Sequence, residues 1–536
     1  MAGPEADDQG WTPARSVAGG RNPWTIIAVI SIATFMVVLD TSIANVALKH
    51  IAGGLAASYD EATWVVTSFL VSNAVVVPIS GWLADVVGRK RYYMISVALF
   101  TLASLLCGLA PSLSVLVAAR VLQGIGGGGL APVEQSMMVD TFPPAKRGAA
   151  FAAYGVVVVV GPIFGPTLGG WITDNLSWHW VFLINLPIGL LSLVLVSIFV
   201  EEPPALIEAR ERLTAGGMRV DWQGFALIAL FLGCLEVTLD RGQRDDWFSS
   251  PMITGFAVVS AVALLSFIPW ELSRRDPIVR IQLYGQRNFM IANVFMLVMG
   301  VIVFGTTQFI PQLLQDVLGY TATNAGLALT LGGFATLLVM PLSGFLTSRV
   351  DARYLIGFSL AIQGIAMWNM SGLDTQMSFS NAAIARLVQS IGLPFLFVPI
   401  TNVAYVGLDP SHNNKASALM NVSRNLGGTF GISLVQTMLA QRLQVHQSQY
   451  VETLNPLHPT YTATIDHMAR ILPQHGLSQA TAGKAAVAEF YQQLVQQMSM
   501  LSYIDVFHTL MVLVFAALPL VLLMRSSDKK ARPGAA

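Results

Sequence analysis

Charged residues are scarce in this sequence of 536 residues. Only 11% of its residues are charged, whereas a soluble globular domain carries about 25%. The 30 basic and 30 acidic side chains cancel, which excludes the basic excess that nucleic-acid binding needs. Cysteine is nearly absent as well. Cys107 and Cys234 both fall inside apolar runs, so they supply neither a disulfide framework nor a metal cluster.

The signatures of several enzyme classes are missing too. No phosphate-binding loop of the Walker type occurs, so ATP is not expected to drive any activity. The eight histidines show no metal-ligand spacing, and no nucleophile or cofactor site is evident. The glycines from Gly124 to Gly129 match a dinucleotide fingerprint only formally, because they continue an apolar run; we interpret them as a site of close helix packing. We therefore expect no enzyme, no cofactor and no metal.

Long apolar runs are what the sequence has instead, with 54% hydrophobic residues. About 20 apolar residues in a helix cross the hydrocarbon core of a membrane. The sequence predicts an all-α integral membrane protein with fourteen spans, at residues 24–45, 63–84, 92–110, 113–133, 149–173, 180–200, 224–240, 252–271, 289–311, 324–348, 354–370, 382–408, 416–439 and 503–524. The first run is too long for a signal-peptide core and lacks a cleavage site, so it is interpreted as a span.

The distribution of lysine and arginine predicts the orientation. With the N-terminus placed inside, 21 of the 30 basic residues fall in inner segments and six in outer segments. The other three, Arg120, Arg386 and Arg424, lie within spans. Because positive charge concentrates on the cytoplasmic side, both termini are predicted to be cytoplasmic.

An internal repeat divides the chain into two halves. Residues 119–126 resemble residues 385–392, and the segment that begins at Gly81 resembles the one at Gly344, in both cases about 265 positions apart. The repeat predicts two six-helix halves of the major facilitator type plus two extra central helices. The predicted parts are a cytoplasmic tail 1–23, the halves 24–200 and 289–524, a central segment 201–288 with the extra helices, a periplasmic loop 441–502 within the second half, and a cytoplasmic tail 525–536.

Asp40 and Arg120 are the ionisable residues that stand out within the spans. An ionised carboxylate inside a membrane costs about 2.5 kcal/mol or more, so Asp40 is expected to face a partner or a cavity. Its predicted depth agrees with that of Arg120 within about 4 Å at 1.5 Å per residue, which allows the two to pair. Asp40 then suits a group that binds a proton and cargo in alternation. The alternatives are a carboxylate solvated at the outer rim and an arginine that snorkels outward.

The connection between the second and third spans, residues 81–91, combines glycine with opposite charges. Asp85 and Arg89 are expected to make charge-assisted contacts that hold the inner face closed, while Gly81 and Gly88 let helices approach. The simpler interpretation is a basic turn on the inner side. The fifth span carries an even more specific pattern, two Gly-Pro pairs four residues apart that predict close packing and a kinked helix: Gly161, Pro162, Gly165, Pro166, Gly169 and Gly170.

Further polar residues within the spans are candidates for lining a substrate cavity, with a structural role as the alternative. They are Asn45, Gln123, Glu134, Arg386, Asn421 and Arg424.

Taken together, these motifs resemble the fourteen-helix drug:proton antiporter branch of the major facilitator superfamily, and within it the EmrB-type multidrug exporters. The resemblance covers nearly the whole chain and rests on the motifs at Asp40, 81–91, Arg120–Gly124 and 161–170. It implies efflux of hydrophobic drugs by alternating access, with the proton as the coupling ion. It assigns proton coupling to Asp40 and Arg120, and an inner gate to Asp85 and Arg89.

The resemblance also implies a place in the bacterial inner membrane, within the lipid bilayer, together with a periplasmic membrane-fusion adaptor and an outer-membrane channel. The segment 441–502 is then a docking element for the adaptor, or else a helical cap over the outer face. A transporter of the same fold that is specific for one metabolite remains the alternative function.

Overall fold

The computed structural model describes residues 16–215, 221–274, 277–375, 379–454, 459–472 and 479–525, and within these ranges the regular structure is entirely helical. Lipid offers no hydrogen-bond partner to the backbone, so each apolar run satisfies its amides and carbonyls within its own helix. The N-terminal half contains α1 (Pro23–Gly54), the short α2 (Tyr59–Ala62), α3 (Trp64–Val87), α4 (Arg89–Gly108), α5 (Leu113–Gly128), α6 (Leu130–Thr141), α7 (Pro144–Asn175), α8 (Trp180–Leu183) and α9 (Asn185–Phe199).

Three helices connect the halves, and seven build the second half. The connecting helices are α10 (Pro204–Ala215), α11 (Trp222–Arg241) and α12 (Pro251–Ser273). The C-terminal half contains α13 (Arg287–Gln312), α14 (Ala322–Thr347), α15 (Ala352–Ser371), α16 (Phe379–Ala404), α17 (Asn413–Thr453), α18 (Pro459–Ile471) and α19 (Gln479–Ala517).

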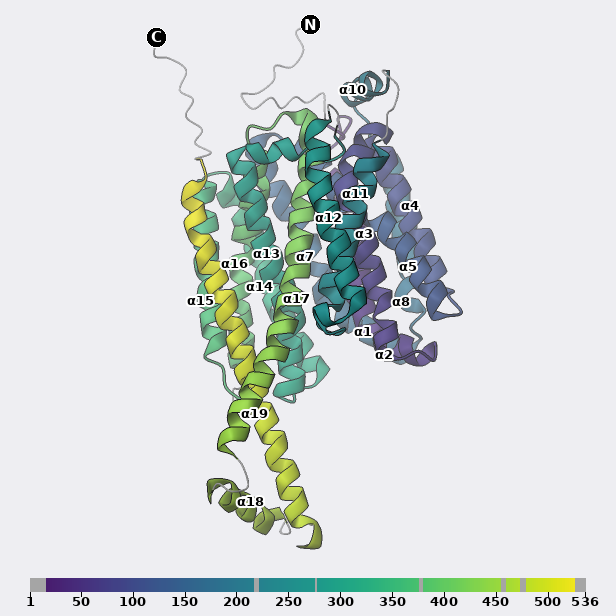
Figure 1. The fold of residues 1–536 in the computed structure, drawn as a ribbon. Coiled ribbons are helices and arrows are strands. Elements are labelled where there is room, and N and C mark those ends of the chain that lie inside the picture. Colours follow the sequence, from purple (N-terminus) through teal and green to yellow (C-terminus); the bar gives the residue numbers. More distant parts are fainter. Residues whose placement is uncertain are drawn as a thin grey trace.

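The helices account for the fourteen predicted spans. Among the described residues, twelve helical stretches are long and apolar enough to cross a membrane. The other two predicted spans are α15 and α17, which are also long helices of the bundle (Figure 1). Both are less apolar, and α17 carries a run of amide and charged side chains that includes Asn421, Arg424 and Asn425. These polar side chains lower the hydropathy of a helix that nevertheless lies inside the bundle.

Several helix ends differ from the predicted span edges. The first span was predicted to end at Asn45, but α1 continues to Gly54. The fourth is divided at Gly129 between α5 and α6. The span edges were wrong in these places because polar residues at a membrane surface remain compatible with a helix, so hydropathy marks the end of the apolar run and not the end of the helix.

The two faces of the bundle are distinguished by what projects from them. We call the face that carries α10 and the end of the last helix the terminal face (Figure 1). At this face the Asn288 side chain bonds the backbone of Arg525, and Arg21 pairs with Glu201. From the opposite face α17 and α19 extend well beyond the bundle and lead to α18, which lies across their far end (Figure 1).

The segment predicted as the loop 441–502 is therefore largely helical. Its first part continues α17 to Thr453, and its last part is the beginning of α19 at Gln479. Between these two parts lies α18, so the segment is a helical projection with short connections.

The halves meet along two helix pairs, α3 with α17 and α7 with α14. Glycine permits the close approach of α7 and α14, because a Cβ on Gly148 would lie 3.0 Å from the Gly344 carbonyl oxygen. The extra helix α11 packs against both α3 and α17, so it covers the seam on one side of the molecule.

Candidate functional site

A buried ion pair lies in the N-terminal half, between the middle of α1 and α5. Arg120 Nη1 donates to Asp40 Oδ2 at 2.6 Å, and both side chains are 0% exposed. Arg120 therefore does not snorkel and Asp40 is not solvated at a rim, which were the two alternatives left by the sequence. The two residues were predicted to lie at similar depths in the membrane, and in the structure they are in direct contact.

Two amides complete the coordination of the carboxylate. Gln123 Nε2 and Asn185 Nδ2 both donate to Asp40 Oδ1, at 2.8 and 2.7 Å. Ser104 accepts from the same two amides, at 3.2 and 2.9 Å, and so fixes their orientation. An ionised carboxylate only accepts hydrogen bonds, and each of its neighbours here is a donor. The arrangement is therefore built for the charged form of Asp40.

The guanidinium group is held from three further directions. Arg120 Nε donates to the Val65 carbonyl at 3.0 Å, and Nη1 donates to Gln123 Oε1 at 2.7 Å. The Phe69 ring lies 4.3 Å from the Arg120 Cζ atom, which adds a cation–π contact. Nη2 has no hydrogen-bond partner among the described residues. Arg120 thus keeps several contacts that do not depend on Asp40.

Asn185 and Ser104 are members of this network that the sequence analysis did not identify. Asn185 is the first residue of α9, which is otherwise strongly apolar, and it is 0% exposed. An asparagine in such a run is a signal in the sequence, because an amide is costly in lipid unless it has partners. Ser104 offers no comparable signal, since serines satisfy their own helix backbone throughout membrane proteins.

Side chains from the start of α17 fasten the second half to the first at the terminal face. Asn413 Nδ2 donates to Asp140 at 2.8 Å, and Asn414 Nδ2 donates to Asp85 at 2.5 Å. Asp140 also forms a buried ion pair with Arg89. Asp85 and Arg89 therefore make charge-assisted contacts at the terminal face, with partners that lie outside the motif.

The glycines of the same motif permit these contacts. A Cβ on Gly81 would lie 2.8 Å from the Asn414 carbonyl oxygen, so only glycine lets α17 approach α3 at this point. Gly88 ends α3 with φ at 97°, a backbone conformation that residues with a Cβ rarely adopt. The two glycines thus have different functions, one in packing and one in the turn.

The fastening continues one and two turns further along α17. Ser417 donates to the Pro132 carbonyl at 2.6 Å, and Asn421 Nδ2 donates to Gln135 Oε1 at 2.8 Å. Asn421, a predicted cavity residue, thus lies where the halves meet. Five side-chain hydrogen bonds connect the halves over this stretch, counting the 3.2 Å bond from Ser417 to Gln135, so the molecule is closed at the terminal face.

The glycines of the fifth span form the contact surface between α7 and α1. A Cβ on Gly161 would lie 2.7 Å from Val38, one on Gly169 would lie 3.0 Å from Ile43, and one on Gly165 would overlap the Ser42 hydroxyl. The predicted close packing is confirmed. Gly170 differs, because a Cβ added there would meet nothing within 4 Å. The helix continues through Pro162 and Pro166.

Close packing also explains the glycines from Gly124 to Gly129. A Cβ on Gly126 would lie 2.6 Å from the Phe100 backbone, and one on Gly128 would lie 2.8 Å from the Asn73 carbonyl. The interpretation as a site of close helix packing is confirmed at these contacts.

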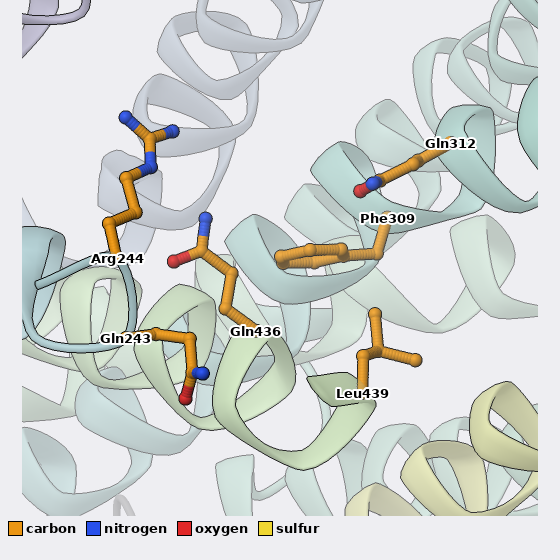
Figure 2. A pocket seen from close by; sticks show the side chains of 6 residues that line it. All are labelled: Gln243, Arg244, Phe309, Gln312, Gln436 and Leu439. Atoms are coloured by element: carbon orange, nitrogen blue, oxygen red, sulfur yellow. The ribbon is translucent and has the colours of Figure 1, made fainter. Parts of the chain in front are cut away.

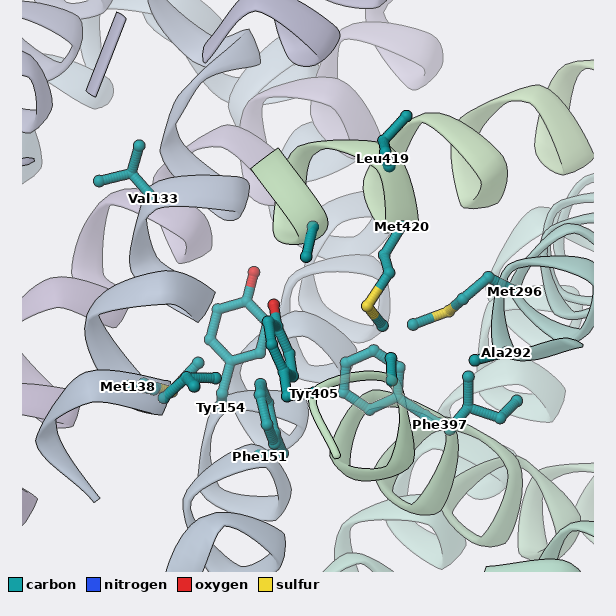
Figure 3. Packing of buried hydrophobic residues seen from close by; sticks show 14 of the residues in the cluster. Val133, Met138, Phe151, Tyr154, Ala292, Met296, Phe397, Tyr405, Leu419 and Met420 are labelled. Atoms are coloured by element: carbon teal, nitrogen blue, oxygen red, sulfur yellow. The ribbon is translucent and has the colours of Figure 1, made fainter. Parts of the chain in front are cut away.

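Glu134 is a second fully buried carboxylate, located where the halves meet. Thr34 donates to its Oε2 atom at 2.6 Å, and the other oxygen has no hydrogen-bond partner among the described residues. The neighbouring Tyr154 stacks on Phe397 of the second half with the ring centroids 6.5 Å apart. Figure 3 shows Tyr154 and Phe151 facing Phe397, Met420 and Met296 across the seam, with Met138 nearby. Glu134 thus lies beside an aromatic and methionine-rich contact between the halves.

The remaining cavity candidates are not gathered into one site. Gln123 belongs to the Asp40 network, and Asn45 is exposed, with its amide donating to the Thr41 carbonyl at 3.1 Å. Arg424 is half-buried on α17, and its Nε has no hydrogen-bond partner among the described residues. Arg386 lies in a separate buried cluster in the second half.

A small hollow opens near the opposite face, in the second half. Its volume is about 210 Å³, and its lining combines side chains from the connection after α11 with others from α13 and α17, namely Gln243, Arg244, Phe309, Gln312, Gln436 and Leu439 (Figure 2). Figure 2 shows the amides of Gln243 and Gln436 together with the Arg244 guanidinium on one side of Phe309. The sequence offered no signal for this hollow, because its walls come from three separate segments.

Two pseudo-equivalent helical halves, with a buried ion pair inside the first of them, are the architecture of a membrane transporter. The comparisons with known proteins support this class. Residues 30–432 match the family model of the Major Facilitator Superfamily. The chain is 41% identical over 431 residues to the multidrug export protein EmrB of Haemophilus influenzae, covering 80% of this chain and 83% of that protein. It is 36% identical over 460 residues to the fatty acid resistance protein FarB of Neisseria gonorrhoeae, covering 86% and 88%.

A solved structure of the proton:xylose symporter XylE matches with a TM-score of 0.58 over 92% of this chain and 95% of that chain. At 14% sequence identity this match shows the fold alone. The chain belongs to the Major Facilitator Superfamily and, within it, to the EmrB-type group. The family resemblance noted in the sequence is therefore confirmed.

Proposed function

We propose that this protein exports hydrophobic toxic compounds in exchange for protons, by alternating access. The observation that carries the proposal is the fully buried Asp40, which is held by one guanidinium and two amide donors. The names of the relatives support the cargo class, since one exports multiple drugs and the other confers fatty acid resistance. An ionisable group is retained in a membrane chiefly where ions or substrates pass.

The network supports a simple coupling step. A proton on Asp40 would remove its negative charge and leave Arg120 with neutral acceptors, the Val65 carbonyl and Gln123 Oε1. The bonds that hold α1 to α5 and α9 would weaken, and α1 could then move relative to α5. Because α1 packs on α7 through the glycines of the fifth span, its movement would be transmitted to the seam between the halves. Protonation and rearrangement of the halves are thereby linked.

The contacts at the start of α17 fit one end state of the cycle. Lysine and arginine concentrate in the segments of the terminal face, which supports placing that face in the cytoplasm. The bonds from Asn413 and Asn414 to the first half would then close the path toward the cytoplasm. Access from the cytoplasm would require these bonds between the halves to separate.

The same orientation places α18 and the extended ends of α17 and α19 in the periplasm of a bacterial inner-membrane protein. Their projection beyond the bundle supports a docking role toward a membrane-fusion adaptor, which would pass cargo to an outer-membrane channel. Replacement of residues 454–478 by a short glycine-serine linker should abolish co-purification of the adaptor. Proton-driven transport in vesicles should persist, and undiminished co-purification would contradict the docking role.

Inside-out membrane vesicles test the transport proposal. An imposed proton gradient, acidic inside the vesicle, should drive accumulation of a hydrophobic fluorescent dye. Asp40→Asn should abolish accumulation per amount of folded protein in the vesicles, because the amide cannot take up a proton at this site. Asp60→Asn, which neutralises an exposed carboxylate on α2, is the matched control and should transport normally. Gradient-driven accumulation by Asp40→Asn would refute the role of Asp40, and uptake of one metabolite but no dye would favour the alternative function.

A further inference from the structure

The second half repeats the geometry of the Asp40 network with one substitution. In α16, Arg386 Nη1 donates to Gln389 Oε1 at 2.5 Å and to the Thr306 hydroxyl of α13 at 3.0 Å. Gln389 Nε2 reaches the same hydroxyl at 2.8 Å. These three residues lie 266 positions after their counterparts in the first half, so the repeat is exact in register.

Threonine stands where the first half has the carboxylate. Thr306 occupies the position related to Asp40, just as Arg386 occupies that of Arg120. The groups that the Arg386 nitrogens contact are neutral: Thr306, Gln389 and Thr307, whose hydroxyl lies 3.1 Å from Nη2. Its Nε has no hydrogen-bond partner among the described residues.

Arg386 is thus a cation that is 7% exposed and has no counter-charge among these contacts. An arginine retains its charge in a protein, and a buried charge is costly unless an opposite charge balances it. The first half balances its arginine from within the chain. In the second half no side chain at the related position carries a negative charge, so a bound anion would have to balance Arg386.

The cluster lies on the helix surfaces that face the other half. Arg386 precedes Phe397 on α16 by eleven residues, and Thr307 follows Met296 on α13 by eleven residues. Eleven residues make about three helical turns, so each pair shares one side of its helix. Phe397 and Met296 point toward the seam between the halves (Figure 3). Arg386 and Thr307 therefore lie on the sides of their helices that face the seam, closer to the opposite face.

We propose that Arg386, Thr306 and Thr307 form a subsite for the carboxylate of an amphipathic anionic cargo. This inference rests on the proposed export function and adds a class of cargo and its binding residues to it. The planar guanidinium suits a carboxylate, and the Thr307 hydroxyl can donate to it as well. The Thr306 hydroxyl donates to the Ile302 carbonyl at 2.7 Å and contributes a neutral side chain at the position of Asp40. Cargo binding supplies in the second half the charge that Asp40 supplies in the first.

The test is equilibrium binding of radiolabelled laurate and of dodecanol to the purified full-length protein in detergent, without a proton gradient. The wild type should bind laurate at least tenfold more tightly than dodecanol, which has the same tail and no charge. Thr306→Asp places an internal carboxylate beside Arg386 and should weaken laurate binding at least thirtyfold, with dodecanol binding unchanged. Thr306→Asn has nearly the same shape without the charge and should weaken laurate binding about threefold or less.

Equal affinities of the wild type for laurate and dodecanol would overturn the subsite, and so would full laurate affinity in Thr306→Asp. Melting curves that agree within a few degrees would show that both variants fold. Asp60→Asn, which changes an exposed carboxylate far from Arg386, should bind laurate as the wild type does. Failure of proton-driven transport with intact, Thr306-sensitive laurate binding would refute the export proposal and not the subsite.

Discussion

Neutralising Asp40 alone should destabilise the protein more than neutralising Asp40 and Arg120 together. Asp40→Asn leaves the fully buried Arg120 without its counter-charge, and breaking a buried pair from one side typically costs about 3–5 kcal/mol. Arg120 keeps the Val65 carbonyl, Gln123 Oε1 and the face of Phe69, so we expect the lower end of that range, about 3 kcal/mol. In Asp40→Asn/Arg120→Gln no buried charge remains, and at least about 2 kcal/mol of the loss should return.

The assay is thermal unfolding in detergent, followed by a thiol-reactive dye. Cys107 is 0% exposed beside Gln123, so with the partly exposed Cys234 replaced by serine in every variant the dye reports on opening of this network. Asp40→Asn should melt well below the wild type and the double variant in between, while both variants fail to transport. If the double variant is no more stable than Asp40→Asn, or if Asp40→Asn melts with the wild type, the two charges are not energetically coupled. The interpretation that Asp40 and Arg120 can be buried because each neutralises the other would then be wrong.

Three shorter predictions concern other parts of the chain. Gly165→Ala should destabilise the protein by about 1–3 kcal/mol because its methyl group overlaps α1, whereas Gly170→Ala meets open space and should be neutral in the same melting assay. Burial and a nearby guanidinium lower the pKa of His412, so stability should be full above about pH 6.5 and fall as the pH drops further; His412→Gln should flatten that part of a stability–pH curve. Thr429→Val removes the hydroxyl that donates to Glu236 at 2.9 Å and should lower transport at unchanged expression, measured in inside-out vesicles; normal transport would make that contact dispensable.

The sequence predicted those features that depend on position along a single helix. The fourteen helices, the contact between Asp40 and Arg120 and the glycine surface of α7 all follow from apolar length, axial rise or spacing by four. The helix ends were predicted less accurately, because they depend on capping residues and on polar residues at the membrane surface. The agreement extends to the second half, where the repeat placed Arg386 at the position related to Arg120.

Partners contributed by distant segments could not be predicted in the same way. Asn414 contacts Asp85 across 329 positions, and Asn185 contacts Asp40 across 145. Which of many polar residues in the spans meet depends on how the helices are rotated about their own axes. A hydropathy pattern with polar residues on several sides leaves that rotation undetermined. The residues predicted to line one cavity therefore lie in different parts of the structure. The ion pair was predicted correctly because it joins one acid and one base at equal depth.

The extra helix α11 shows how the halves are connected beyond their seam. Its Glu236 accepts a hydrogen bond from Thr429 of α17, and four residues later Asp240 accepts one from Thr67 of α3 at 2.5 Å. Residues four apart lie on the same side of a helix, so one surface of α11 is bonded to both halves. Alternating access requires α3 and α17 to shift relative to each other, and a rigid helix cannot keep both bonds through such a shift. Under the proposed alternating access, one of these two bonds would therefore break in part of the cycle.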